Sequence, residues 1–209
     1  MTDILILIFE LIGTVAFALS GAMIGLQKKM DIFGIATLGL ITSVGGGVIR
    51  DLVLGNTPPE TFKNPIYGVV AVATSLIVFI PAFRKLHSRS KSIFDFVLLI
   101  MDSLGLAVFT VMGIKTAVTV NGEFNIYLLL FVGLITGTGG GIIRDVLAQH
   151  TPYVFVKHFY ATASLIGAGV CIALWKYTGE FIALISGAVV IFVLRMFAAH
   201  YHWKLPKVE

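Results

Sequence analysis

Seven long apolar stretches follow one another along the chain, separated by short polar segments. Each stretch is close to the ~20 residues that an α-helix needs to cross a hydrocarbon core of ~30 Å, whereas barrel strands would be about half as long. A spanning segment must also satisfy its own backbone hydrogen bonds. The pattern therefore predicts seven transmembrane helices, at Ile4–Leu26, Ile32–Leu54, Ile66–Phe83, Ile93–Ile114, Ile126–Ala148, His158–Trp175 and Phe181–Ala199.

Composition supports a membrane protein and excludes other classes. The 209-residue chain is 57% hydrophobic and 12% charged, with a mean hydropathy of +0.98. A soluble domain carries about twice that share of charged residues. The low share of charged residues therefore excludes an ordinary cytosolic enzyme and a disordered chain. A disulfide scaffold is excluded as well, since the single Cys171 cannot form an intramolecular disulfide. We expect an all-α polytopic membrane protein with one transmembrane domain over residues 1–209.

The sequence contains an internal duplication. Residues 39–51 (GLITSVGGGVIRD) and 133–145 (GLITGTGGGIIRD) agree at ten of thirteen positions, at an offset of 94. We therefore expect two three-helix repeats, at about 4–83 and 93–175, followed by a seventh helix at about 181–199. Because three is odd, the second repeat enters the membrane from the opposite side. Folds of this inverted kind place their sites near the bilayer midplane, on broken helices.

The duplicated glycine triplets mark a candidate ion pathway in the second and fifth predicted helices. Glycine costs about 0.8–1.0 kcal/mol in a helix interior relative to alanine, so three in a row favour a kink or an unwound turn. Such a break exposes backbone groups that can coordinate ions. The alternative is close helix packing through small residues. The candidate residues are Gly45, Gly46, Gly47, Gly139, Gly140 and Gly141.

Four hydroxyl side chains precede the triplets, namely Thr42, Ser43, Thr136 and Thr138. They either line the same pathway or bond back to the helix carbonyl four residues earlier, which is the commoner habit.

Each repeat carries an Arg-Asp pair just after its triplet, Arg50-Asp51 and Arg144-Asp145. Ionisable residues inside a span are costly unless they are paired or hydrated. Adjacent residues on a helix do not face each other. We therefore expect pairing across the repeats, Arg50 with Asp145 and Arg144 with Asp51. These pairs either line the pathway or form a purely structural network that joins the two halves.

Two further carboxylates, Glu10 and Asp102, hold matching positions in the first helix of each repeat, at an offset of 92. Both lie within apolar sequence. They either line the pathway, which would favour cations or couple protons, or pair across helices with Arg50 and Arg144.

The basic residues predict the orientation of the chain. The connections between helices one and two, three and four, and five and six share one side of the membrane with the C-terminus. Ten Lys and Arg belong to that side and three to the other: Lys28, Lys29, Arg84, Lys85, Arg89, Lys91, Lys157, Arg195, Lys204 and Lys207, against Lys63, Lys115 and Lys176. Because cytoplasmic loops favour Lys and Arg, we expect the N-terminus outside and the C-terminus in the cytoplasm. The net charge of +4 fits this bias, so we expect no nucleic-acid partner.

Catalytic motifs give no competing signal. The glycine triplets lack the Gly-Lys-Ser/Thr continuation of a phosphate-binding loop, and no Ser/His/Asp or Cys/His constellation is evident. His200 and His202 stand without an accompanying Cys or acidic cluster. We therefore expect no enzyme, no cofactor and no metal beyond a transient monovalent cation.

Two three-helix repeats, a seventh helix and paired Gly-Gly-Gly-x-x-Arg-Asp motifs resemble the prokaryotic trimeric intracellular cation (TRIC) channel family. Its bacterial branch is also described as glycine transporters. The resemblance covers nearly the whole chain. It implies a homotrimer in the bacterial inner membrane, in contact with lipids, in which each subunit has its own pore. It also implies that the pore is lined by the second and fifth helices, kinked at the glycine triplets, and conducts monovalent cations such as potassium.

Two functions thus remain open from the sequence. The first is a passive potassium channel. The second is a secondary transporter of glycine or another small zwitterion, since half-helix N-termini suit a carboxylate, and Glu10 or Asp102 suits an ammonium group. A structural membrane protein without transport is a third, weaker hypothesis.

Overall fold

The computed structural model describes residues 2–81, 83, 90–122, 124–156 and 159–203. Six basic residues counted above, and His158 at the start of the sixth predicted span, lie outside these ranges: Arg84, Lys85, Arg89, Lys157, Lys204 and Lys207. The regular elements of the described part are all helices: α1 Thr2–Gln27, α2 Ile32–Val53, α3 Glu60–Lys63, α4 Ile66–Ile77, α6 Lys91–Asn121, α7 Ile126–Leu147, α8 Tyr153–Val156, α9 Ala161–Thr178 and α10 Glu180–His200.

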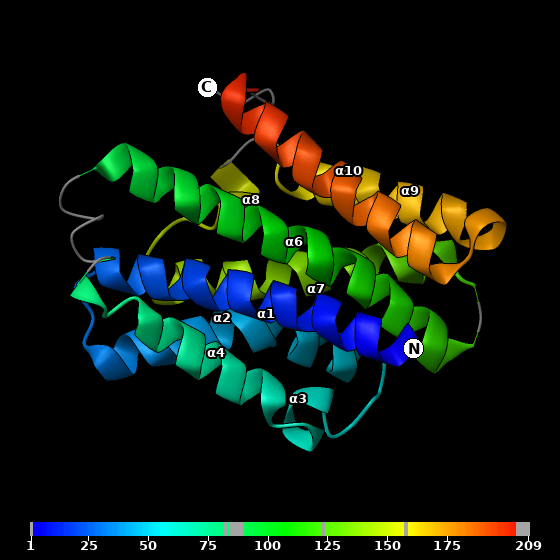
Figure 1. Ribbon diagram of the computed structural model, residues 1–209. Coiled ribbons are helices and arrows are strands. Elements are labelled where there is room, and N and C mark those ends of the chain that lie inside the picture. Colours follow the sequence, from blue (N-terminus) through cyan, green and yellow to red (C-terminus); the bar gives the residue numbers. More distant parts are fainter. Residues whose placement is uncertain (1, 82, 84–89, 123, 157–158, 204–209) are drawn as a thin grey trace.

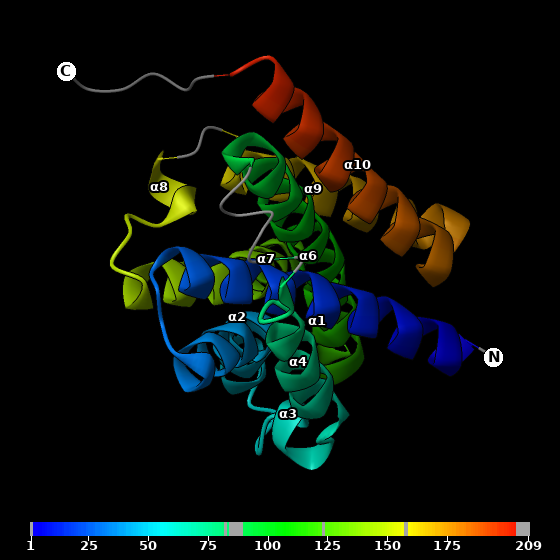
Figure 2. The ribbon, with the colours of Figure 1, turned by 60° about the vertical axis from the view of Figure 1, so that its left-hand side comes forward.

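Four long helices form the centre of the molecule, and the others flank them on two sides. Helix α1 packs on α2 and α6, and α7 packs on both α2 and α6. Helices α3 and α4 lie on the α2 side, and α9 and α10 lie on the opposite side (Figures 1 and 2). Segments from the two predicted repeats therefore meet at the α1–α6 and α2–α7 contacts, and the candidate residues of α2 and α7 lie at the second of these.

Five of the helices are long and apolar enough to cross a membrane among the described residues: α1 (from Ile4), α2, α6, α7 and α10. They correspond to the first, second, fourth, fifth and seventh predicted spans. Helix α4 has 12 residues, which is about 18 Å at 1.5 Å per residue and short of the ~30 Å core. Helix α9 has 18 residues and begins at Ala161, three residues after the predicted start of the sixth span at His158.

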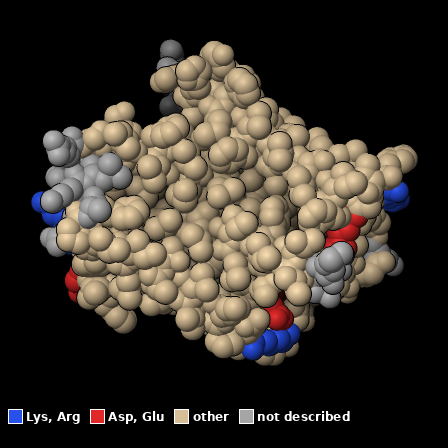
Figure 3. All heavy atoms as spheres, viewed as in Figure 1, with Lys and Arg blue, Asp and Glu red and all other residues tan. Residues whose placement is uncertain are grey.

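The outer surface agrees with a membrane setting. In Figure 3, one broad face of the molecule is almost free of charged residues, and the Lys, Arg, Asp and Glu that are visible lie toward its edges. Large apolar side chains such as Phe33, Val69 and Val189 are exposed on the helices, where lipid would cover them. The protein is therefore an all-helical polytopic membrane protein.

The duplicated sequence produces duplicated local structure. Asp31 caps the start of α2 by accepting a hydrogen bond from the Gly34 amide, and Asn125 does the same for the Leu128 amide at the start of α7. Both helices end in a residue of positive φ, Gly55 after α2 and Gln149 after α7. These capped ends set the same length of 22 residues for α2 and α7, which places their glycine triplets at the same depth along each helix.

Candidate functional site

Helices α2 and α7 run without interruption through their glycine triplets. The expected unwound turn, with exposed carbonyl and amide groups, is therefore wrong. The physical reason lies in the packing between the two helices. A β-carbon at Gly46 would overlap the carbonyl oxygen of Thr136, and one at Gly140 would overlap the carbonyl oxygen of Thr42. The glycines allow the two backbones to approach closely, which offsets their low helix propensity.

The first and the third glycine of each triplet have different surroundings. A β-carbon at Gly45 would lie 3.0 Å from Ile143 Cδ1, and one at Gly139 would lie 3.3 Å from the Gly46 Cα, so these residues also belong to the helix crossing. The third glycine of each triplet faces away from the crossing and toward an arginine. A β-carbon at Gly47 would have Arg50 Nη2 as its nearest neighbour, at 3.8 Å.

The expected pairing of charges across the repeats is wrong. Arg50 Nε donates to its neighbour Asp51 Oδ1 at 2.8 Å, and Arg144 Nε donates to Asp145 Oδ1 at 2.8 Å. The rule that adjacent helical residues do not meet fails here because each aspartate lies within the last three residues of its helix. The chain then turns back over it, so that the carboxylate serves two partners at once.

The second partner of each aspartate is the backbone of the following short helix. Asp51 Oδ2 accepts from the Glu60 amide of α3 at 2.8 Å, and Asp145 Oδ2 accepts from the Tyr153 amide of α8 at 2.9 Å. Each aspartate therefore holds its own arginine in place and fastens the returning chain to the end of the long helix.

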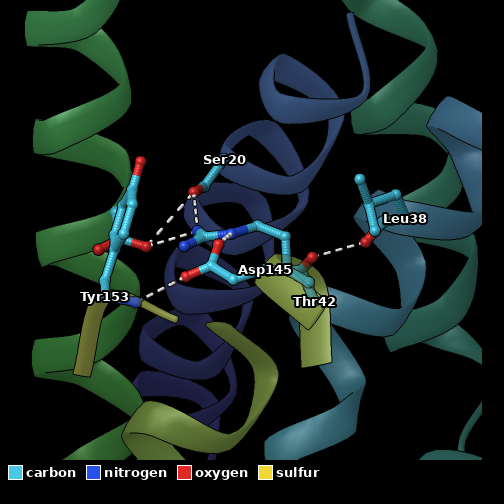
Figure 4. A network of polar contacts seen from close by, with 7 residues as sticks. Ser20, Leu38, Thr42, Asp145 and Tyr153 are labelled. Atoms are coloured by element: carbon cyan, nitrogen blue, oxygen red, sulfur yellow. Dashed lines mark hydrogen bonds and ion pairs between the residues drawn. The ribbon is translucent and has the colours of Figure 1, made fainter. Parts of the chain in front are cut away.

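Arg144 lies at the centre of a buried network that joins the two halves. Figure 4 shows part of this network, around the labelled Ser20, Asp145 and Tyr153. Its Nη1 donates to Asp102 Oδ1 of α6 and to Ser20 Oγ of α1, both at 2.5 Å. Arg144 is fully buried, and Asp102 is 1% exposed. Figure 4 shows Ser20 and Asp145 approaching the same guanidinium from different helices. Of the two expectations for Asp102, pairing with Arg144 is thus confirmed.

Glu10, the carboxylate of the first half that corresponds to Asp102, lies beside a cavity. Glu10 Oε2 accepts a hydrogen bond from Tyr67 Oη of α4 at 2.5 Å, and the ion pairs of the described residues include none between Glu10 and Arg50. Beside Glu10 is a polar cavity with a water-accessible volume of about 30 Å³, room for one or two water molecules. Its lining is Glu10, Thr14, Ser43, Val44, Gly47, Arg50, Glu60, Thr61, Tyr67 and Phe109.

The hydroxyl groups before the triplets follow the commoner habit. Thr42, Thr136 and Thr138 each donate to the carbonyl four residues earlier, and Ser43 donates to the Leu40 carbonyl at 2.9 Å. Of the four, only Ser43 is among the residues that line the Glu10 cavity. Thr42 and Thr136 instead contact Gly21 and Gly113, where α1 meets α2 and α6 meets α7.

Three residues of these sites escaped the sequence analysis. Tyr67 and Tyr160 lie 93 residues apart, close to the offset of the repeat, and each lies beside the arginine of its own half. This spacing identifies the two tyrosines as matching positions of the repeats from the sequence alone. Arg195 was counted with the loops, but it lies inside α10 at 2% exposure, with its Cζ 4.8 Å from the Tyr160 ring centre.

A bundle of membrane-length helices with ionisable groups in its interior is the construction of channels and transporters. The chain belongs to the Glycine transporter family, whose sequence pattern matches residues 7–82 and 99–176. Relatives include the inner membrane protein YadS of Escherichia coli K12, 38% identical over 94% of this chain and 93% of its own length. The membrane protein YvgT of Bacillus subtilis is 33% identical over 95% of this chain and 94% of its own length.

Solved structures of TRIC channels share the fold. A prokaryotic TRIC channel crystallised in 0.5 M KCl is 32% identical, with a TM-score of 0.87 over 97% of this chain and 100% of the other. The TRIC orthologue from Rhodobacter sphaeroides is 32% identical, with a TM-score of 0.85 over 95% and 99%. A third structure, reported for conductance through TRIC cation channels, is 36% identical with a TM-score of 0.84 over 97% and 96%. The resemblance to the TRIC family is thereby confirmed.

Proposed function

We propose that the protein is a monovalent cation channel whose ions pass the Glu10 cavity, with potassium as the main permeant ion. The observation that carries this proposal is the charge of the lining. Glu10 and Glu60 both line the cavity, whereas the one guanidinium there, that of Arg50, already pairs with Asp51. The cavity therefore has an excess of carboxylate, which attracts cations and repels anions.

The small size of the cavity fits a closed or narrow pathway. Tyr67 bridges to Glu10 across the lining, and Gly47 leaves room beside Arg50 because it has no side chain. Release of the Tyr67 hydroxyl would widen the passage and free the carboxylate to contact an ion. A bend of α2 and α7 at their glycine triplets, which the resemblance implies, would also widen the passage.

The proposed assembly and orientation follow the family and the charges of the loops. We take residues 1–209 as one transmembrane domain with two inverted three-helix repeats and a seventh helix. The N-terminus lies outside and the C-terminus lies in the cytoplasm. Three copies form a homotrimer with one pore in each subunit, as the channels it resembles imply. Native mass measurement from mild detergent should give three chains, and a stable monomer would remove the trimer from the proposal.

Flux measurements in liposomes test the function against its main alternative. Purified protein should release potassium down its gradient without any glycine present, and sodium or chloride release should be slower. The alternative, transport of glycine, predicts uptake of labelled glycine and no electrical leak for potassium. Glycine uptake without potassium flux would therefore overturn the channel proposal.

A further inference from the structure

The two halves of the molecule contain the same three side chains in two different arrangements. Each half has a carboxylate, an arginine and a tyrosine at matching positions, namely Glu10, Arg50 and Tyr67 in the first half and Asp102, Arg144 and Tyr160 in the second. In the first half the tyrosine holds the carboxylate, and a polar cavity with room for water lies beside the bond. In the second half the arginine holds the carboxylate, and all three side chains are buried.

The arrangement of the second half leaves one polar atom of each of these side chains without a hydrogen-bond partner. Among the described residues, the buried atoms of this kind are Asp102 Oδ2, Ser103 Oγ, Arg144 Nη2, Tyr160 Oη and Arg195 Nε. Buried polar groups in native proteins are nearly always paired, so these exceptions require an explanation. Ser103 and Arg195 have no counterpart in the first repeat, because Leu11 matches Ser103 and α10 has no equivalent there. The other three are the set that the two halves share.

The three shared groups of the second half are neighbours. A β-carbon at Gly141 would lie 3.2 Å from Tyr160 Oη and 3.7 Å from Arg144 Nη2, so the hydroxyl and the guanidinium face the same point. Asp102 Oδ1 accepts from the other terminal nitrogen of this guanidinium. Of the charged groups around Tyr160, Asp102 acts on its hydroxyl most strongly. Tyr160 is therefore the unpaired hydroxyl beside the Arg144–Asp102 pair.

We propose, on the basis of the cation pathway inferred above, that Asp102, Arg144 and Tyr160 form a second gate of that pathway and that Tyr160 holds this gate open. In the closed arrangement of this structure, Arg144 Nη1 binds Asp102. In the open arrangement Arg144 releases Asp102, and Tyr160 Oη donates a hydrogen bond to the freed carboxylate, as Tyr67 Oη donates to Glu10. The exchange supplies the Tyr160 hydroxyl with the acceptor that it lacks in the closed arrangement. We call these three residues the Asp102 gate.

This exchange of partners changes the charge that the pathway presents to an ion. A carboxylate bound to a guanidinium is neutralised, whereas a tyrosine hydroxyl donates a hydrogen bond and leaves the carboxylate its negative charge. Such a carboxylate attracts a passing cation. Arg144 does not become an isolated charge, because its Nε remains bonded to Asp145, as Arg50 Nε is bonded to Asp51 in the half that has the cavity.

Ser20 distinguishes the two halves and accounts for the closed state of the second. Ser20 Oγ of α1 accepts from Arg144 Nη1 at 2.5 Å and lies 3.5 Å from Asp102 Oδ1, so it supports the closed pair. The residue that matches Ser20 at the offset of 92 is Met112. A thioether is only a weak acceptor, so the first half lacks a matching hydroxyl for the corresponding pair.

Accessibility of a cysteine placed in the Asp102 gate tests the proposal without any measurement of current. Cys171 is the only cysteine of the chain, so Cys171→Ala gives a cysteine-free background. Ser20→Cys then places one thiol against Arg144 and Asp102. The folded protein in mild detergent is treated with a small, positively charged methanethiosulfonate. Because Ser20 is fully buried in the closed arrangement, its thiol should react only as fast as the gate opens.

Tyr160→Phe in this background removes the hydrogen bond of the open arrangement alone. Modification of the thiol should therefore slow about tenfold, as expected for the loss of one hydrogen bond to a charged group. The unfolding temperature should not fall, because Tyr160 Oη has no partner in the closed arrangement. Tyr177→Phe is the matched control: it removes an exposed hydroxyl near the end of α9 and should change neither quantity.

Single-channel recording is a second measurement and needs no cysteine. Tyr160→Phe in the otherwise native chain should lower the fraction of time spent open about tenfold and leave the conductance of the open state unchanged. An unchanged open fraction in the folded variant would overturn the proposal.

Two results of the cysteine experiment would also overturn it. Equal modification rates with and without Tyr160→Phe would show that the Tyr160 hydroxyl does not hold the gate open and pairs with buried water instead. No modification of folded Ser20→Cys, under conditions in which the unfolded protein reacts fully, would show that the Asp102 gate stays closed. The thiol reaction does not require ion flow, so a protein that fails to conduct potassium would refute the channel function separately.

Discussion

Substitution of alanine for the central glycine of each triplet tests the interpretation of α2 and α7 as a close helix crossing. At Gly46, the new β-carbon would overlap the Thr136 carbonyl oxygen and lie 3.1 Å from its carbonyl carbon and 3.4 Å from the Gly140 nitrogen. All three atoms belong to the backbone, so no side chain can rotate to make room. The two helices would have to move apart, and their other contacts would weaken.

The expected loss of stability follows from two opposing terms. Overpacking of this kind costs about 1–3 kcal/mol, and the higher helix propensity of alanine returns about 0.8–1.0 kcal/mol. Because the atoms met at Gly46 and Gly140 belong to the backbone, the clash cost lies in the upper part of that range, about 2–3 kcal/mol. We therefore expect Gly46→Ala to destabilise the protein by about 1–2 kcal/mol, and Gly140→Ala by a similar amount. Gly47→Ala gains the propensity term without a clash, because its nearest neighbour is Arg50 Nη2 at 3.8 Å. It should stabilise the fold by up to about 1 kcal/mol.

Thermal unfolding in mild detergent, followed by the loss of native elution volume, measures this contrast. For a chain of this size each kcal/mol corresponds to about 2–4 °C, so Gly46→Ala and Gly47→Ala should differ by about 2–12 °C. Gly169→Ala on α9 is a second control, since nothing lies within 4 Å of its β-carbon position. If Gly46→Ala and Gly140→Ala unfold at the same temperature as Gly47→Ala, the glycine triplets do not support a close helix crossing.

Three further predictions concern the charged groups. Arg144→Ala should lower the free energy of unfolding by about 3–5 kcal/mol, because it leaves the buried Asp102 and Asp145 without their partner. Arg50→Ala should lower it less, because the Arg50 side chain borders a cavity with room for water. Chemical unfolding measures both losses. The losses from Arg144→Ala and Asp102→Ala should be clearly non-additive in a double-mutant cycle, and strict additivity would show that the pair does not interact. A C-terminal reporter should be active in the cytoplasm, and periplasmic activity would reverse the proposed orientation.

The sequence was sufficient for the coarse architecture because hydrophobic length and duplication are properties of the chain itself. The matching motifs, at an offset of 94, predicted that α2 and α7 would be equivalent, and the structure gives both the same length, the same kind of cap and the same Asp-to-backbone contacts. The third predicted span is not one continuous helix: α4 ends at Ile77, residues 78–80 form a turn and a bend, and helix is assigned again at Pro81 and Phe83.

The errors arose where tertiary contacts override a local rule. Helix propensity suggested a break at the triplets, but propensity does not include the facing backbone that makes glycine favourable at Gly46 and Gly140. The neighbour rule for helical side chains ignored the returning chain after Asp51 and Asp145. The position of Arg195 against Tyr160 depends on how α10 packs on α6 and α9, which the one-dimensional pattern does not contain.

Single-channel recording in planar bilayers under a potassium chloride gradient shows whether cations pass beside Glu10. We expect a reversal potential close to the potassium equilibrium value. Glu10→Gln should lower both the conductance and the preference for cations over chloride. Glu180→Gln removes an exposed carboxylate at the start of α10 and should change neither quantity. Unchanged conductance and selectivity in well-folded Glu10→Gln would show that cations do not pass beside Glu10.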